Sequence, residues 1–312
     1  MNNNVYNYQK VKRRSGLTKA LAACLVVAVA AFAVIVYTII RRNNSVDADT
    51  NAALTPGYTT AESQGEVVSY INGKIPYYEG VEKNTYSAAA FLLNSETGRI
   101  NYADTSVRTE TGIDVSAHQG EIDWAQAAAD GIDFAIIRAG FRGYGSSGAL
   151  NTDDKFTENI EGCLNNGIKV GVYFYSQAVS AAEAAEEADY TLDIIKGYEL
   201  DYPVVFDWEN EDGVDMRTDN VRASELTSFA SAFCDRIVSN GYKPAIYMNL
   251  DSAYVKYDLG SLPNYPLWFA STGDTVPELY YHFAIWQYSH SGNVAGIDSQ
   301  VDLNIAFPDE LN

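Results

Sequence analysis

Residues 203–210 read Pro-Val-Val-Phe-Asp-Trp-Glu-Asn, a short apolar run that ends in two carboxylates. An apolar run of this length is typical of a buried β-strand. Side chains alternate along a strand, so Asp207 and Glu209 are predicted to share one face. Similar apolar runs lie on both sides of this one, at residues 134–138, 169–175, 244–248, 267–270 and 283–288.

Helical patterns separate several of these runs. Ser180 and Glu183 form a capping-box pattern that predicts a helix from there toward Lys196. Farther along, apolar residues recur at the spacing of one helix face, at Leu226, Phe229, Phe233 and Ile237. The sequence therefore predicts strands that alternate with helices.

A glycine follows each of four predicted helices, at Gly131, Gly167, Gly197 and Gly241. Glycine is favoured there because the residue after a helix often adopts a left-handed conformation. Repeated strand–helix–glycine–strand units indicate parallel crossovers. Seven or eight strands in about 200 residues favour an α/β fold of the irregular (β/α) barrel type, resembling a TIM barrel, over an open doubly wound sheet.

The carboxyl ends of barrel strands are where catalytic residues are expected. Two neighbouring acids there raise each other's pKa, so that one stays protonated while the other ionises, as glycosidic bond cleavage requires. The alternative is that Asp207 and Glu209 are a solvated pair at a loop edge. Asp114 and Asp302 lie in the first and last apolar runs, so a closed barrel would bring them to the same mouth, although each could also be structural.

The chain contains 23 Tyr, and aromatic faces stack on sugar rings. Candidate substrate-binding residues near strand ends are Tyr173, Tyr175, Tyr247 and Trp286. The alternative is that they pack in the core or at the rim. Residues 143–148 match G-x-G-x-x-G, but no helix begins inside these glycines, so a dinucleotide site is not expected.

Charge is unevenly distributed along the 312 residues. Residues 1–42 hold seven of the 21 basic residues and none of the 41 acidic residues, so the remainder carries a net charge of −27. Such an acidic domain repels phosphate backbones, which makes nucleic acid a poor partner. Three Cys and three His do not indicate a disulfide scaffold or a structural zinc site; Cys163 and Cys234 are predicted to be buried thiols.

Residues 20–40 are uncharged and long enough to span a bilayer. Basic residues flank them, with five before and two after. We therefore expect residues 1–19 to be a cytoplasmic tail, 20–40 a single transmembrane helix, and the rest to lie outside the cell. Cleavage as a signal peptide, or lipidation at Cys24, are the alternatives; a buried core helix is less compatible with the length and flanks.

Residues 41–110 are predicted to be a partly ordered linker or stalk. The stretch 43–65 lacks periodicity, whereas 66–110 contains two candidate hairpins, one turning at Asn72-Gly73 and one at residues 96–98. This second part could pack on the main domain or form a stalk. The main domain is expected to span 111–312.

Several motifs, in this order, resemble glycoside hydrolase family 25, the Chalaropsis-type lysozymes or N-acetylmuramidases. They are 112–116 (GIDVS), 119–120 (QG), 122–124 (IDW), 134–140 (FAIIRAG), 207–209 (DWE), 286–288 (WQY) and 301–304 (VDLN). The resemblance covers roughly residues 110–308. It implies an irregular (β/α) barrel that hydrolyses the β-1,4 bond between N-acetylmuramic acid and N-acetylglucosamine in peptidoglycan.

The resemblance also implies residue roles. Glu209 would be the general acid, Asp207 would assist it, and Asp114 and Asp302 would complete the acidic cleft, with no metal or organic cofactor. An aspartate that activates water, or the substrate's own acetamido group, could act as the nucleophile. Two other functions remain open: a non-catalytic ectodomain that binds cell-wall glycans, and an enzyme for another glycan such as chitin.

Overall fold

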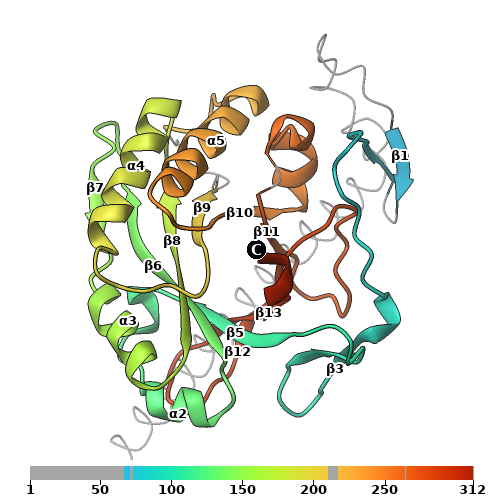
Figure 1. Ribbon diagram of the computed structural model, residues 1–312, viewed down its shortest axis with the longest axis vertical. Coiled ribbons are helices and arrows are strands. Elements are labelled where there is room, and N and C mark those ends of the chain that lie inside the picture. The colour runs from blue at the N-terminus through green and yellow to red at the C-terminus, as the bar shows by residue number, and fades with distance from the viewer. Residues whose placement is uncertain (1–66, 71–72, 210–216, 264, 312) are drawn as a thin grey trace, which may run out of the picture. The chain divides into compact units, whose positions relative to one another are not determined.

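The computed structural model describes residues 67–70, 73–209, 217–263 and 265–311. In this part of the chain eight strands close into a barrel, so the predicted barrel is confirmed (Figure 1). The strands, in order around it, are β5 (Glu110–Val115), β6 (Phe134–Arg142), β8 (Lys169–Ser176), β9 (Val204–Trp208), β10 (Pro244–Asn249), β11 (Leu267–Ala270), β12 (Ile285–Gly292) and β13 (Val301–Ala306).

The barrel is irregular at its closure. Strands β5 to β12 are parallel to their neighbours within the barrel, but β13 runs antiparallel to both β12 and β5. The connection between β12 and β13, residues 293–300, contains no helix and takes the place of a helical crossover. As a result, the first and last strands lie side by side, with Asp302 directly opposite Asp114.

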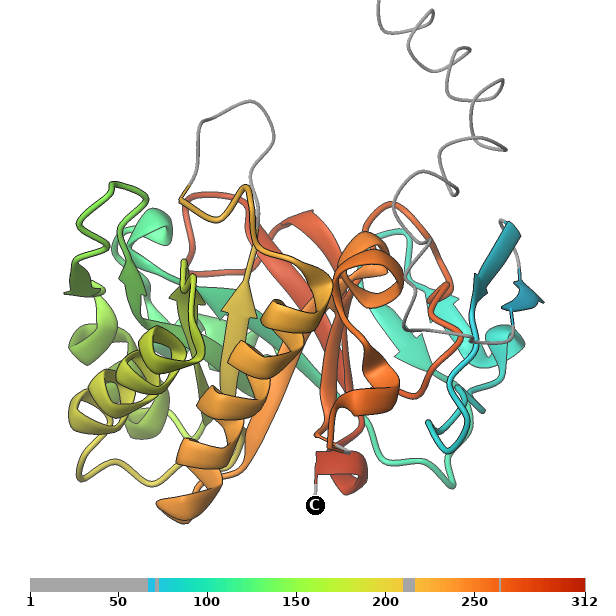
Figure 2. The same cartoon turned by 90° about the horizontal axis from the view of Figure 1, so that it is seen from above.

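Helices cover only part of the barrel. They are α2 (Trp124–Ala129), α3 (Phe156–Asn165), α4 (Ala181–Ile194) and α5 (Ala223–Ser239). Figure 2 shows the yellow α4 and orange α5 along the outside of the strands. After β10 the helices of the described chain are all short, at Ser252–Lys256, Leu259–Ser261 and Pro308–Leu311.

The predicted capping box at the start of α4 is confirmed in part, and the predicted terminal glycines are confirmed. The Ser180 hydroxyl accepts a hydrogen bond from the Glu183 N–H at 3.2 Å and so caps α4. Glu183 does not return the bond to Ser180, because its carboxylate accepts from the Val179 N–H instead. The four glycines predicted to end helices have φ between +72° and +94°.

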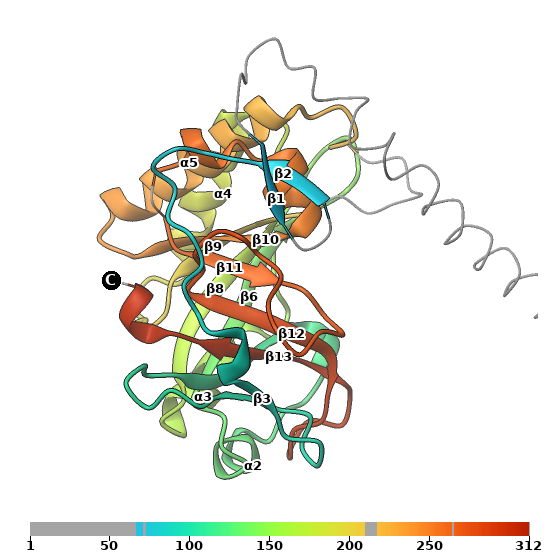
Figure 3. The ribbon, with the colours of Figure 1, turned by 90° about the vertical axis from the view of Figure 1, so that its right-hand side faces the viewer.

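An N-terminal segment, residues 67–70 and 73–109, covers the side of the barrel where helices are missing (Figure 3). It contains two antiparallel hairpins, β1 (Val67–Tyr70) with β2 (Gly73–Pro76), and β3 (Phe91–Leu93) with β4 (Ile100–Tyr102). Tyr70 pairs with Gly73, one residue from the register that a turn at Asn72-Gly73 would give.

Aromatic contacts attach this segment to the barrel. The Tyr86 ring stacks on Phe307 with centroids 3.9 Å apart, and the Phe91 ring lies edge-on to Trp286 at 5.3 Å. Of the two possibilities left open for residues 66–110, packing on the barrel is the one seen in the described part. The segment does here what a helix does elsewhere in the barrel, namely exclude water from the outer face of β11 to β13.

Side chains fill the barrel itself and form a core separate from the layer beneath the helices. Near its base the Phe134 ring stacks on Tyr202 with centroids 4.2 Å apart. Gly112 lies against this ring, and a Cβ there would come within 2.3 Å of it. These side chains fill the barrel interior at this level.

Two other predictions can be compared with the structure, and a third lies outside the described residues. Residues 143–148 form the loop between β6 and β7 (Leu150–Thr152), so they lead into a strand and not into a helix. Cys163 and Cys234 are buried free thiols, as predicted. Residues 20–40 lie outside the described residues; within the described ranges, none of the helices is long and apolar enough to cross a membrane.

Candidate active site

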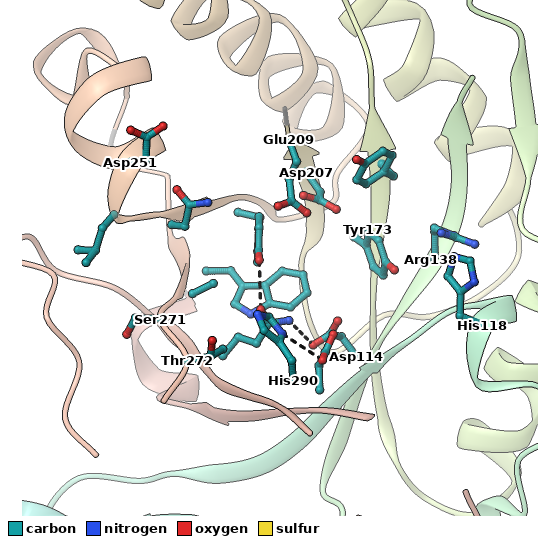
Figure 4. Close-up of a pocket in the computed structure, with 18 of the residues that line it drawn as sticks. Asp114, His118, Arg138, Tyr173, Asp207, Glu209, Asp251, Ser271, Thr272 and His290 are labelled. Carbon is teal, nitrogen blue, oxygen red and sulfur yellow. Dashed lines mark hydrogen bonds and ion pairs between the residues drawn. The ribbon is translucent and has the colours of Figure 1, made fainter. Parts of the chain in front are cut away.

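A cleft of about 870 Å³ opens at the carboxyl ends of the barrel strands. Every second residue of each strand faces the barrel interior, and the last inward-facing residues of the strands line this cleft. Asp114, Asp207, Glu209 and Asp302, the four predicted catalytic acids, all line it. Figure 4 shows Asp207 and Glu209 side by side, both directed into the cavity from the end of β9.

Asp114 is held by a network of hydrogen bonds at the closure of the barrel. Its Oδ2 accepts from the side-chain amides of Gln287 and Asn304, both at 2.8 Å. Each amide oxygen in turn accepts a hydrogen bond, one from the Tyr247 hydroxyl at 3.1 Å and one from the Trp268 indole at 2.8 Å. These contacts fix the direction of the Asp114 carboxylate.

Burial raises the pKa of Asp114 well above its ordinary value, and the nearby charge of Asp302 raises it further. The two amide donors oppose this shift because they favour the ionised form. The net result is a carboxyl group that resists ionisation next to a second carboxyl group that is more exposed.

Asp207 has much less support. It is only 5% exposed, and its Oδ1 is buried with no hydrogen-bond partner among the described residues. Burial, followed by the charges of Glu209 and Asp114, raises its pKa well above the ordinary value. A group in this state costs folding free energy, and such groups are concentrated at functional sites.

His290 contacts Asp302, the acid that lies opposite Asp114. The Nδ1 of His290 is 3.2 Å from Oδ1 of Asp302. This contact raises the pKa of His290, because a carboxylate stabilises the imidazolium, and partial burial opposes the shift. Neither His290 nor its pairing with Asp302 was predicted from the sequence.

Three of the four predicted aromatic residues line the cleft: Tyr173, Tyr175 and Tyr247. The expectation for Trp286 has to be corrected. It is fully buried on the outer face of β12, where it lies against Phe91 and donates a hydrogen bond to the Ser271 carbonyl. On this strand it is Gln287 that faces inward, and Trp268 of β11 supplies the indole that lines the cleft.

Sequence reasoning also missed the polar residues that surround the acids. Arg138, Gln287 and Asn304 each lie two residues along a strand from another inward-facing residue. Period-two alternation, extended from Asp302 to Asn304 for example, would have indicated them. In the described ranges no group of three or more His, Cys, Asp or Glu side chains is arranged to hold a metal ion.

Comparison with known proteins agrees with this geometry. The family model of glycosyl hydrolases family 25 matches residues 113–297. An autolytic lysozyme of Clostridium acetobutylicum is 29% identical over 196 residues, which cover 62% of this chain and 54% of that protein. Lysozyme M1 of Streptomyces globisporus is 28% identical over 214 residues, which cover 66% of this chain and 69% of that protein.

A solved structure supports the same assignment. The bacterial lysozyme from Streptomyces coelicolor superposes with a TM-score of 0.50 at 27% sequence identity, over 64% of this chain and 92% of that one. The chain spans about half the length of the Clostridium protein. Since the family model covers more than half of the 312 residues, this chain belongs to glycosyl hydrolases family 25.

Proposed function

We propose that this chain is a muramidase that hydrolyses the β-1,4 bond between N-acetylmuramic acid and N-acetylglucosamine in peptidoglycan. The observation that carries the proposal is the convergence of four carboxyl groups, from β5, β9 and β13, on one cleft lined with tyrosines. The family assignment and the relatives described as lysozymes support it.

Glu209 is the proposed general acid. It follows β9 directly and points into the cleft beside Asp207 (Figure 4). A general acid must hold a proton until the leaving oxygen takes it, and a neighbouring carboxylate favours the protonated state. Protonation of the glycosidic oxygen by Glu209 then lets the bond to the anomeric carbon break.

Asp207 is proposed to stabilise the positive charge that develops on the sugar ring as this bond breaks. Its partly unpaired carboxylate is suited to this role, because no hydrogen bond to Oδ1 has to be broken first. Water activated by an aspartate, or the substrate acetamido group oriented by Asp207, completes the reaction. Asp114 and Asp302 form the opposite wall of the acidic cleft.

The decisive experiment is analysis of the products. The purified full-length chain in mild detergent should clear a suspension of peptidoglycan and release fragments whose new reducing ends are muramic acid. Glucosamine ends would reject the muramidase assignment. Glycan binding without any cleavage, on several wall preparations, would favour the non-catalytic alternative.

Glu209→Gln tests the acid itself. This variant should lose about 10³-fold in rate while its unfolding transition stays near that of the wild type. The matched control is Asp274→Asn, which removes an exposed carboxylate from the same cleft at its rim. The control should keep its rate within about threefold of the wild type, since Asp274 is not a member of the central cluster.

We further propose that the chain is a single-pass membrane protein with a cytoplasmic N-terminus and an extracellular barrel. The uncharged residues 20–40 and their basic flanks support this. Anchoring would concentrate the enzyme near newly exported wall. Extraction tests it: the protein should stay with membranes at alkaline pH, and added protease should reach the barrel in intact spheroplasts. Release into the alkaline supernatant would contradict the anchor.

A further inference from the structure

The cleft is strongly acidic except at one end. Six carboxyl groups line it, at Asp114, Asp207, Glu209, Asp251, Asp274 and Asp302. Among the described lining residues, Arg138 is the one that carries a permanent positive charge. It extends from the inner face of β6 and shares a bond to Asp153 with the backbone next to His118; in Figure 4, Tyr173 separates it from Asp207.

Asp153 holds the Arg138 guanidinium from behind. The Arg138 Nε donates to Asp153 Oδ2 at 2.7 Å, and the same oxygen accepts from the Ala117 N–H at 3.1 Å. The other oxygen of Asp153 accepts from the Lys155 N–H at 3.0 Å. Asp153 is fully buried, so it is a rigid support that also ties the loop bearing His118 to Arg138.

This support leaves the outer edge of the guanidinium available. Only Nε is used by Asp153, and no described residue accepts a hydrogen bond from either terminal nitrogen of Arg138. The group also lies over the Phe141 ring, 5.3 Å from its centroid, which restricts its movement. A fixed guanidinium edge that faces a cleft is complementary to a carboxylate, because it can donate two parallel hydrogen bonds.

Two tyrosines of the cleft lie near this part of β6. Tyr144 and Tyr175 line the cleft with their rings edge-to-face and their centroids 6.0 Å apart, and Tyr175 pairs across the strands with Phe141, the ring under Arg138. A sugar ring packed on them would bring its substituents toward Arg138. No hydrogen bond links Arg138 to Asp207 among the described contacts, and the charge of Arg138 acts on Asp207 only through space, where it opposes the rise in the pKa of that acid.

We propose that Arg138, with His118 beside it, is a subsite for a carboxylate carried by the muramyl part of the substrate. This proposal rests on the proposed function. The carboxylate has two sources: the lactyl group of a muramyl unit that has lost its peptide, or an acidic residue of an attached peptide stem. A glycan of N-acetylglucosamine alone has neither, so the subsite would favour peptidoglycan over chitin.

The first part of the test removes the negative charge of the substrate carboxylates and uses the wild-type protein. Soluble peptidoglycan fragments are prepared with stems intact and with stems removed by an amidase, and half of each is converted to primary amides with carbodiimide and ammonia. The full-length wild type should show a KM about tenfold higher on the amidated form of whichever fragment supplies the carboxylate. The fragment that shows the effect identifies the source.

Variants then locate the effect. Arg138→Gln should raise KM on the unmodified fragment by about the same factor and lose the response to amidation, whereas Arg138→Lys should keep part of it. The matched control is Lys196→Gln, which removes an exposed cation that does not line the cleft. This control should respond to amidation as the wild type does.

Three results would overturn the proposal. Equal KM values of the wild type on all four substrates would reject the subsite whether or not the variants fold. A loss in Arg138→Gln that falls on kcat equally for charged and amidated fragments would show that Arg138 acts on the catalytic acids. Failure of the wild type to cleave any fragment would instead reject the muramidase function on which the subsite rests.

Discussion

Two carboxyl groups face the interior of the same barrel from opposite ends, and their hydrogen-bond partners differ. Glu110 is 7% exposed at the closed end and is bonded by Arg108, Lys169 and the Tyr202 hydroxyl. Asp207 is 5% exposed at the open end, and its Oδ1 has no partner among the described residues. The solvent exposure of the two side chains is nearly equal, so exposure alone does not decide what a buried acid does.

The pKa of each of these two acids depends on its hydrogen-bond donors and on the charges near it. Burial raises the pKa of Glu110, but the three donors outweigh it and the net shift is downward. Burial raises the pKa of Asp207, and the charges of Glu209 and Asp114 add to the effect. The closed end therefore uses its acid to hold strands together, whereas the open end keeps an acid in an unfavourable state that is available for chemistry.

The largest expected effect is on activity at the open end. Asp207→Asn should lower the rate of peptidoglycan cleavage by about 10²- to 10³-fold, because the amide cannot stabilise developing positive charge. Glu110→Gln, the matched change at the closed end, should alter the rate by less than about threefold. Turbidity clearing at equal concentrations of folded protein measures both. Similar losses for the two variants would erase the functional contrast.

The second prediction concerns stability at the closed end. Glu110→Gln should lower the free energy of unfolding at pH 7 by about 2 kcal/mol, because the buried Tyr202 hydroxyl and two cations lose a charged acceptor. The folded-state pKa of Glu110 is lowered, so its contribution is present above the unfolded pKa of about 4.3 and is lost as pH falls through the folded value. Urea unfolding at pH 7 and pH 3 should show a smaller difference at pH 3.

The third prediction is an increase in the free energy of unfolding. Asp207→Asn should raise the free energy of unfolding by about 1 kcal/mol at pH 7, since the folded protein disfavours the ionised carboxylate that the unfolded chain adopts freely. The folded-state pKa of Asp207 is raised, so its stability is fully present below about 3.9 and is lost as pH rises through the folded value. The advantage of the variant should therefore vanish near pH 3. A gain that did not change with pH would have another cause.

The smallest effect belongs to an exposed pair that serves as a baseline. Asp189 of α4 and Arg236 of α5 form a bidentate ion pair, and each side chain is about half exposed. Asp189→Asn should change the free energy of unfolding by at most about 0.5 kcal/mol, and less in high salt. A larger loss would mean that ion-pair geometry, and not burial, controls the energy of acids in this protein.

Much of the site could be predicted because it depends on short-range patterns. Asp207 and Glu209 share a face through strand alternation alone, and the apolar run before them places them at the end of a strand. Their meeting with Asp114 and Asp302 required one additional assumption, that the barrel closes. Trp286 shows the limit of this reasoning, because proximity to a strand end was used without the alternation that directs the neighbouring Gln287 inward.

By itself the sequence determined the order of strands and helices, the glycines that end the helices, and the acids at strand ends. These depend on neighbours within about four residues along the chain. The tertiary structure alone decided that residues 73–109 cover the barrel where helices are missing, that Asn304 and Gln287 hold Asp114, and that Asp153 supports Arg138. Such contacts join residues that are distant along the chain, or on different elements, and exist only once barrel closure has set which side chains face each other.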